Sequence, residues 1–139
     1  MNFIEEDLEM RYVKLVTVML IALLAGYAYA ADKMPEGVQA RKSDAGAMVL
    51  ADAKGMTLYT YDKDADGKSN CAGRCLMNWP ALIATGNAMN MGDWTVVTRD
   101  DGAKQWAYKG KPLYTFAKDT KPGDTTGDGV GMVWHNALP

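Results

Sequence analysis

The sequence predicts a mainly β protein: one small domain built from two tandem repeats that each contain a β-hairpin, with one short helical turn and one disulfide. Three observations support this fold class. An eleven-residue segment recurs with its spacing intact, β-favouring runs alternate with glycine turns, and one short segment has helical character. At 139 residues, with an apolar run near its start, the chain has room for a single domain.

The repeat is visible in residues 54–64, KGMTLYTYDKD, which return 55 positions later at 109–119 as KGKPLYTFAKD. Seven of the eleven positions are identical, and the same offset places Trp79 on Trp134 without a gap. A register kept over this length is typical of a duplication. We therefore expect a two-repeat domain over 46–139, with repeat 1 over about 46–100 and repeat 2 over about 101–139.

Each repeat is expected to contain a strand, a tight turn and a second strand. The predicted strands are 47–52, 56–62, 94–98, 104–108, 111–116 and 131–135. Gly55 and Gly110 supply the positive φ that the two hairpin turns require. A helical turn is expected over 72–78, and it ends before Pro80, which disfavours helical geometry in the residue before it.

The first 30 residues are expected to be a cleaved signal peptide. The run 15–28 is almost wholly apolar, follows two basic residues and ends in Ala-Tyr-Ala at 28–30. It is shorter than the roughly 20 apolar residues of a membrane span, so we expect cleavage after Ala30. Acidic residues before Arg11 make Met10 the alternative start. Residues 31–45 are expected to be a flexible lead-in.

Charge and cysteine content limit the expected partners and compartment. From residue 31 onward, 13 lysines and arginines balance 13 acidic residues without a basic run, so nucleic acid is not an expected partner. The two cysteines, Cys71 and Cys75, are expected to pair in an oxidising compartment, the periplasm or the exterior. Neither lies near the cleavage site, so no stable membrane anchor is expected after processing.

Two motifs carry a family resemblance. A Tyr-x-aromatic-x-x-Asp pattern occurs at 59–64 and 114–119, and residues 68–80 hold the cysteine pair and a Trp-Pro step. Together they resemble the secreted-repeat family of predicted bacterial lipoproteins, whose function is uncharacterised. The resemblance covers about 46–136 and implies a fold and a compartment but no activity. The chain departs from the family in lacking the lipidation cysteine, and repeat 2 lacks the cysteine pair.

The motif side chains have two interpretations. They are Tyr59, Tyr61, Asp64 and Trp79 with their counterparts Tyr114, Phe116, Asp119 and Trp134. In the first interpretation the aromatic residues pack the core together with Trp106 and Tyr108, and each aspartate closes a turn or accepts a tyrosine hydrogen bond. In the second, the aromatic residues two apart on one strand face form an exposed ligand platform.

An acidic segment offers a calcium interpretation. Asp62, Asp64 and Asp66 alternate before Gly67, as in the opening of a calcium loop. Position twelve of such a loop is Gly73 instead of glutamate, and no second helix is expected. A solvated acidic turn is therefore the preferred interpretation.

Soft ligands offer a copper interpretation. Met89, Met91 and His135 have the ligand types that suit Cu(I), and they resemble in type those of small periplasmic copper and silver carriers. Nothing in the sequence brings His135 near Met89. Methionines that fill gaps in the core and a surface histidine are the simpler interpretation.

The usual catalytic pairings are missing from the sequence. There is one histidine, no serine elbow motif, no phosphate loop, and a Cys-x-x-x-Cys spacing that differs from that of thiol oxidoreductases. The sequence therefore favours a non-catalytic binding or structural module of the envelope, with an envelope protein or a small ligand as partner. A copper or silver carrier is the alternative. A thiol redox protein that cycles Cys71 and Cys75 is the third hypothesis.

Overall fold

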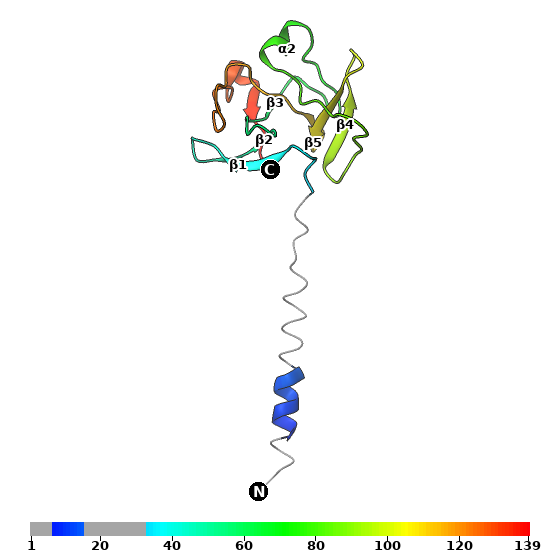
Figure 1. Cartoon of the computed structure of the whole chain (residues 1–139), viewed down its shortest axis with the longest axis vertical. Helices are drawn as coiled ribbons and strands as arrows, with labels where there is room; N and C mark the ends of the chain where they lie inside the picture. The colour runs from blue at the N-terminus through cyan, green and yellow to red at the C-terminus, as the bar shows by residue number, and fades with distance from the viewer. Residues whose placement is uncertain (1–6, 16–32) are drawn as a thin grey trace. The chain divides into compact units, whose positions relative to one another are not determined.

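The computed structural model describes residues 7–15, which are helical, and residues 33–139, which belong to a separate compact unit (Figure 1). The predicted cleavage site after Ala30 and most of the apolar run lie outside the described residues. Within the two described ranges, no helix is long and apolar enough to cross a membrane.

Residues 33–139 are mainly β, as the sequence predicts, and the Cys71–Cys75 disulfide is formed. The three small sheets are antiparallel and have the orders β1-β2, β3-β7 and β4-β5-β6. The elements in chain order are β1 Gln39–Lys42, β2 Met48–Ala51, β3 Tyr59–Tyr61, α2 Arg74–Asn78, β4 Trp94–Thr98, β5 Lys104–Tyr108, β6 Lys111–Pro112, the 3₁₀ turn η1 Val130–Met132 and β7 Trp134–Asn136.

The two repeats have the same local structure. Gln39 lies opposite Ala51 in the β1–β2 hairpin, and Thr95 lies opposite Ala107 in the β4–β5 hairpin, 56 residues later. After the following turn the offset falls to 55 because the turn at 109–110 is one residue shorter than the turn at 53–55. The helix α2 then corresponds to η1.

The repeats exchange strands instead of folding separately. Tyr59 and Tyr114 exchange backbone hydrogen bonds of 2.7 and 3.0 Å. Strand β3 of repeat 1 pairs with β7 of repeat 2, and Ala81 of repeat 1 reciprocally bridges Tyr114 of repeat 2. Each repeat therefore completes the sheet of the other, and this pairing places the motif residues at the centre of the unit.

Two hydrophobic clusters form the core. The first holds Trp106 and Tyr108 together with Leu50, Leu58, Trp94 and Leu113. The second holds Trp79 and Trp134 with Tyr59, Cys71, Tyr114 and Phe116. The single core expected around Trp79, Trp106, Tyr108 and Trp134 is therefore divided between two clusters.

The structure differs from the expected flexible lead-in at residues 39–42, which form β1. This strand has the sequence Gln-Ala-Arg-Lys and is mostly exposed, so it carries no apolar alternation. It forms through backbone pairing with β2 at a sheet edge. Strands β4 and β5 have the expected bounds, whereas β6 stops at Pro112, which has no N–H to donate to a ladder.

Candidate functional site

The motif tyrosines and aspartates are joined crosswise between the repeats. The Tyr59 hydroxyl donates to Asp119 Oδ2 at 2.6 Å, and the Tyr114 hydroxyl donates to Asp64 Oδ2 at 2.7 Å. Each tyrosine therefore bonds the aspartate of the other repeat. Tyr59 and Tyr114 are fully buried and Phe116 is nearly so, which leaves no exposed aromatic platform among these three residues.

Burial is the main influence on the pKa of both tyrosines. It raises the pKa of Tyr114 to about 12, with a further increase from the hydrogen bond to Asp64 and an opposing effect of Ser69. Burial and the bond to Asp119 raise the pKa of Tyr59 as well. Burial also raises the pKa of Asp64, opposed by its hydrogen bonds from Asn70 and Tyr114. Both phenols are therefore neutral at physiological pH.

We expect Tyr114 to ionise near pH 12 in the folded protein, whereas an exposed tyrosine ionises near about pH 10. Because the pKa of the folded state is the higher one, the stability that the neutral phenol contributes is present below about pH 10 and is lost as the pH rises towards 12. Phenolate absorbance measured against pH checks this. Tyr114→Phe should lack the step near pH 12, and a wild-type protein whose tyrosines all titrate near their ordinary pKa would contradict the prediction.

Four aromatic rings stack face to face through the second cluster, in the order Tyr61, Trp134, Trp79, Phe116. The three successive centroid separations are 4.2, 3.8 and 4.1 Å, and the interplanar angles are 14°, 3° and 22°. We call these four rings the aromatic column. Tyr59 contacts Trp79 edge-on at 5.3 Å, and Tyr114 contacts Trp134 edge-on at 5.2 Å.

Arg99 is a buried residue that the sequence did not reveal. Its side chain is 4 % exposed, and its guanidinium donates to Ser69 Oγ and Gln105 Oε1 at 2.7 Å and to the Cys71 carbonyl at 2.5 Å. Ser69 in turn lies 2.6 Å from the Tyr114 hydroxyl. A polar chain therefore links Arg99, Ser69, Tyr114 and Asp64. Charged residues are mostly exposed, so no sequence signal marked this position.

The disulfide closes a loop with a Cα–Cα distance of 5.3 Å between Cys71 and Cys75. Cys71 is fully buried in the second cluster, and Cys75 is half-buried. A thiolate that attacks this bridge would therefore find easier access at Cys75.

Replacing both cysteines with alanine is expected to lower the free energy of unfolding by about 2 kcal/mol, because the bridge closes a very short loop. Urea denaturation of the two proteins measures the difference. The oxidised and the reduced wild-type protein should differ by a similar amount, and no loss of stability in either comparison would contradict the expectation.

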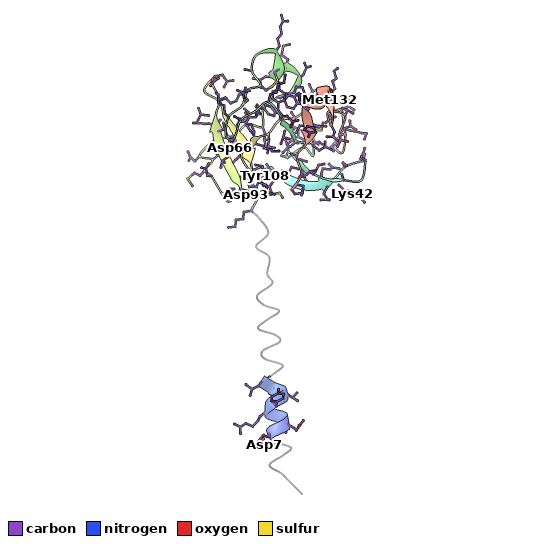
Figure 2. All side chains as sticks on the ribbon, turned by 180° about the vertical axis from the view of Figure 1, so that it is seen from behind. Asp7, Lys42, Asp66, Asp93, Tyr108 and Met132 are labelled. Carbon is purple, nitrogen blue, oxygen red and sulfur yellow. A yellow bond between two sulfur atoms is a disulfide. The ribbon has the colours of Figure 1, made fainter. Side chains whose placement is uncertain are left out.

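A groove surrounds the turn between β5 and β6. Two pockets of about 410 and 280 Å³ share Thr60, Lys109 and Lys111. Their remaining polar lining residues are Tyr61, Asp62, Asp64 and Asp66 in the first and Tyr108, His135 and Asn136 in the second. We call this pair of pockets the lysine groove. A third pocket of about 530 Å³ adjoins it through Asp66 and Lys109, and Figure 2 shows Asp66, Tyr108 and Asp93 on one flank of the unit.

The charged groups of the lysine groove break the internal symmetry. Asp62 Oδ2 and His135 Nε2 are hydrogen-bonded at 2.7 Å, and both side chains are about half exposed. The residues at the equivalent positions of the other repeat are Ala117 and Pro80, and Lys111 corresponds to Met56. The duplication therefore explains the buried motif residues but not these exposed groups.

The turn in this groove holds a lysine in a strained conformation. Lys109 and Gly110 have φ values of 49° and 81°. Left-handed backbone costs a residue with a side chain about 1–2 kcal/mol, and asparagine or aspartate is the usual choice at such a position. The Lys109 ammonium lies 4.7 Å from the centroid of the Tyr108 ring. Lys109 therefore occupies a backbone conformation that asparagine, aspartate or glycine adopts more readily.

The predicted calcium ligands are used in other ways. Asp62 bonds His135, and Asp64 accepts hydrogen bonds from the Asn70 amide and the Tyr114 hydroxyl. Asp66 lies beside Gly110. Within residues 7–15 and 33–139, no group of three or more histidine, cysteine or acidic side chains is placed so that it could hold a metal ion.

The predicted copper ligands are not brought together by any contact in the described part of the chain. Met89 is 77 % exposed, and Met91 packs against the first cluster. His135 lies on β7 and bonds Asp62. Met91 therefore occupies a core position, as the simpler interpretation expects, whereas the exposed Met89 fills no gap in the core.

Comparison with known proteins matches the two structural repeats. A family described as a secreted repeat of unknown function covers residues 39–83 and 95–137. The matches start at β1 and in β4, earlier than the predicted boundaries at 46 and 101, because these strands open the repeats. No curated protein and no solved structure matches the chain. The resemblance seen in the motifs is confirmed, and the chain belongs to this family of secreted repeats.

Proposed function

We propose that residues 31–139 form a non-catalytic binding module that acts in the periplasm after removal of the signal peptide and holds its partner in the lysine groove. The observation that carries the proposal is the break in symmetry. The tyrosine pair Tyr59/Tyr114 and the tryptophan pair Trp79/Trp134, which both repeats share, are buried in the fold. In contrast, Asp62, Lys111 and His135 differ from the residues at the equivalent positions and line one groove.

The side chains that could act in catalysis are already bonded to other groups of the fold, and this supports a non-catalytic role. The two cysteines are joined, and both buried tyrosines donate to carboxylates. Among the described residues, His135 bonds Asp62 and no hydroxyl or thiol nucleophile. Nucleophilic catalysis requires a nucleophile within hydrogen-bond reach of its base.

The composition of the groove indicates the chemistry of the partner. Lys109 and Lys111 offer ammonium groups, and Asp62 and Asp66 offer carboxylates in the same pocket. Asn136 lines the second pocket, and its Oδ1 is a buried acceptor without a hydrogen-bond donor in the described part of the chain. A ligand that carries both charges and N–H donors matches this set, as an extended segment of an envelope protein does.

Site-specific photo-cross-linking in the periplasm of the source cell tests the proposal. A photoreactive amino acid replaces Lys111 in the groove, and the matched control replaces Lys54, an exposed lysine in the equivalent turn of repeat 1. We expect a discrete adduct from position 111 that excess unlabelled protein competes away, and none from position 54. Equal adducts at both positions, or none at position 111, would overturn the proposal.

A further inference from the structure

The aromatic column has a geometry that suits charge transfer better than it suits stability. Aromatic pairs prefer offset or edge-to-face arrangements to a direct sandwich. Carbon atoms in contact lie about 3.5–4.0 Å apart, so a centroid separation of 3.8 Å at 3° leaves little lateral offset between Trp79 and Trp134. The fold therefore holds these indoles where their π orbitals overlap most strongly.

The column continues beyond this pair in both directions. Phe116 stacks on Trp79, and Tyr61 stacks on Trp134 at 4.2 Å. Trp134 is 5 % exposed, whereas Tyr61 is half-buried and lines the first pocket of the lysine groove. Tyr61 is therefore the place where a molecule in solvent comes into contact with the stack.

A proton acceptor stands where an oxidised tyrosine would need one. Tyr114 contacts Trp134 edge-on, and its hydroxyl donates to Asp64 Oδ2 at 2.7 Å. A phenol that loses an electron becomes strongly acidic, so a carboxylate at hydrogen-bond distance takes its proton without further movement. Ser69 Oγ lies 2.6 Å from the same hydroxyl and itself accepts a hydrogen bond from Arg99, so the phenolic oxygen keeps a hydrogen-bond partner after the proton has left.

We infer that the aromatic column conducts one-electron oxidation from the surface at Tyr61 to the buried pair Tyr114–Asp64, where the protein stores a tyrosyl radical. This activity is independent of the proposed binding role. The ligand class is a one-electron oxidant that contacts the groove at Tyr61.

The step balances as follows. The oxidant takes one electron from the column at Trp134 through Tyr61 and is itself reduced by one electron. The indole radical cation of Trp134 then takes one electron from Tyr114. The phenolic O–H bond of Tyr114 breaks, its proton passes to Asp64 Oδ2, and a neutral tyrosyl radical remains beside a protonated carboxyl group.

Tyr59 is the weaker candidate for storage, although it contacts the column in the equivalent way. Its acceptor Asp119 also accepts hydrogen bonds from the Thr126 amide and hydroxyl. These bonds stabilise the carboxylate and make it a poorer base. Asp64 accepts a single additional bond, from the Asn70 amide at 2.6 Å.

Flash photolysis of the purified protein tests the inference. Photo-oxidised ruthenium tris-bipyridine, with persulfate as the sacrificial electron acceptor, is the oxidant, and transient absorption and electron paramagnetic resonance report the radicals. In the wild type we expect an indole radical that decays as a tyrosyl radical appears, with the second step slowed in deuterium oxide. Tyr114→Phe should lose the tyrosyl signal and prolong the indole signal.

The matched control is Tyr59→Phe, because it removes the hydroxyl that is equivalent to that of Tyr114 in the other repeat, and it should retain the tyrosyl signal. If Tyr114→Phe fails to fold, Asp64→Asn serves in its place, since it keeps the shape but removes the base, and the tyrosyl signal should be lost there too. A tyrosyl signal of wild-type size in either variant, or no effect of deuterium oxide on the wild-type protein, would overturn the inference.

Discussion

Replacing Trp134 with alanine is expected to lower the free energy of unfolding by about 3–5 kcal/mol, the usual cost of truncating a buried aromatic residue. Trp134 is 5 % exposed and contacts three other rings, those of Tyr61, Trp79 and Tyr114. Small domains have a total stability of only about 5–15 kcal/mol, so the variant should be marginally folded. Urea denaturation followed by tryptophan fluorescence measures the change.

The internal symmetry supplies the comparison for this prediction. Trp79→Ala removes the equivalent ring and should lower the free energy of unfolding by a similar amount. Met132→Ala lies two residues before Trp134 but removes a side chain that is 85 % exposed, so it should change stability by less than about 0.5 kcal/mol. An equal loss of unfolding free energy in Trp134→Ala and Met132→Ala would contradict the prediction that the aromatic column stabilises the fold.

Neither repeat is expected to fold alone. Cutting the chain after Asn87, in an exposed loop, gives fragments 31–87 and 88–139. The first would keep β3 but lose its partner β7, and the Tyr59–Asp119 and Tyr114–Asp64 bonds would both be broken. Chains of this length bury too little surface to be stable without such partners.

Circular dichroism of the separate fragments should show no cooperative unfolding transition. An equimolar mixture should regain one, because each fragment supplies the strands that complete the sheets of the other. A cooperative transition in either fragment alone would show that the repeats are independent units and would contradict the exchange of strands.

The sequence predicted part of the local structure, because local structure depends on local patterns. The predicted strands 56–62 and 111–116 are shorter in the structure, and the predicted strand 131–135 begins in the 3₁₀ turn Val130–Met132. Trp94–Thr98 is rich in β-favouring residues and is separated from Lys104–Tyr108 by a glycine turn, and the structure has strands with these bounds. β1 was missed because Gln-Ala-Arg-Lys has no apolar face. Its formation depends on the backbone of β2, which a pattern of side chains does not report.

The partners of the motif residues could not be predicted in the same way. A duplication shows that Tyr59 and Tyr114 are equivalent, but it is compatible both with bonds inside each repeat and with bonds between the repeats. The burial of Arg99 depends on acceptors from two separate segments, Ser69 and Cys71 in one and Gln105 in the other. Hydrogen bonds between a charged group and residues distant in the sequence cannot be predicted from residue spacing or composition.

The most direct test of the proposed binding role changes the strained lysine of the groove. Lys109→Asn in the protein that carries the cross-linker at position 111 relieves left-handed strain of about 1 kcal/mol and removes a cation–π contact worth about 0.5–1 kcal/mol. The free energy of unfolding should therefore change by less than about 0.5 kcal/mol, as for an ordinary surface substitution. The account predicts that this stably folded variant loses the competable adduct. An undiminished adduct in a folded Lys109→Asn protein would contradict it.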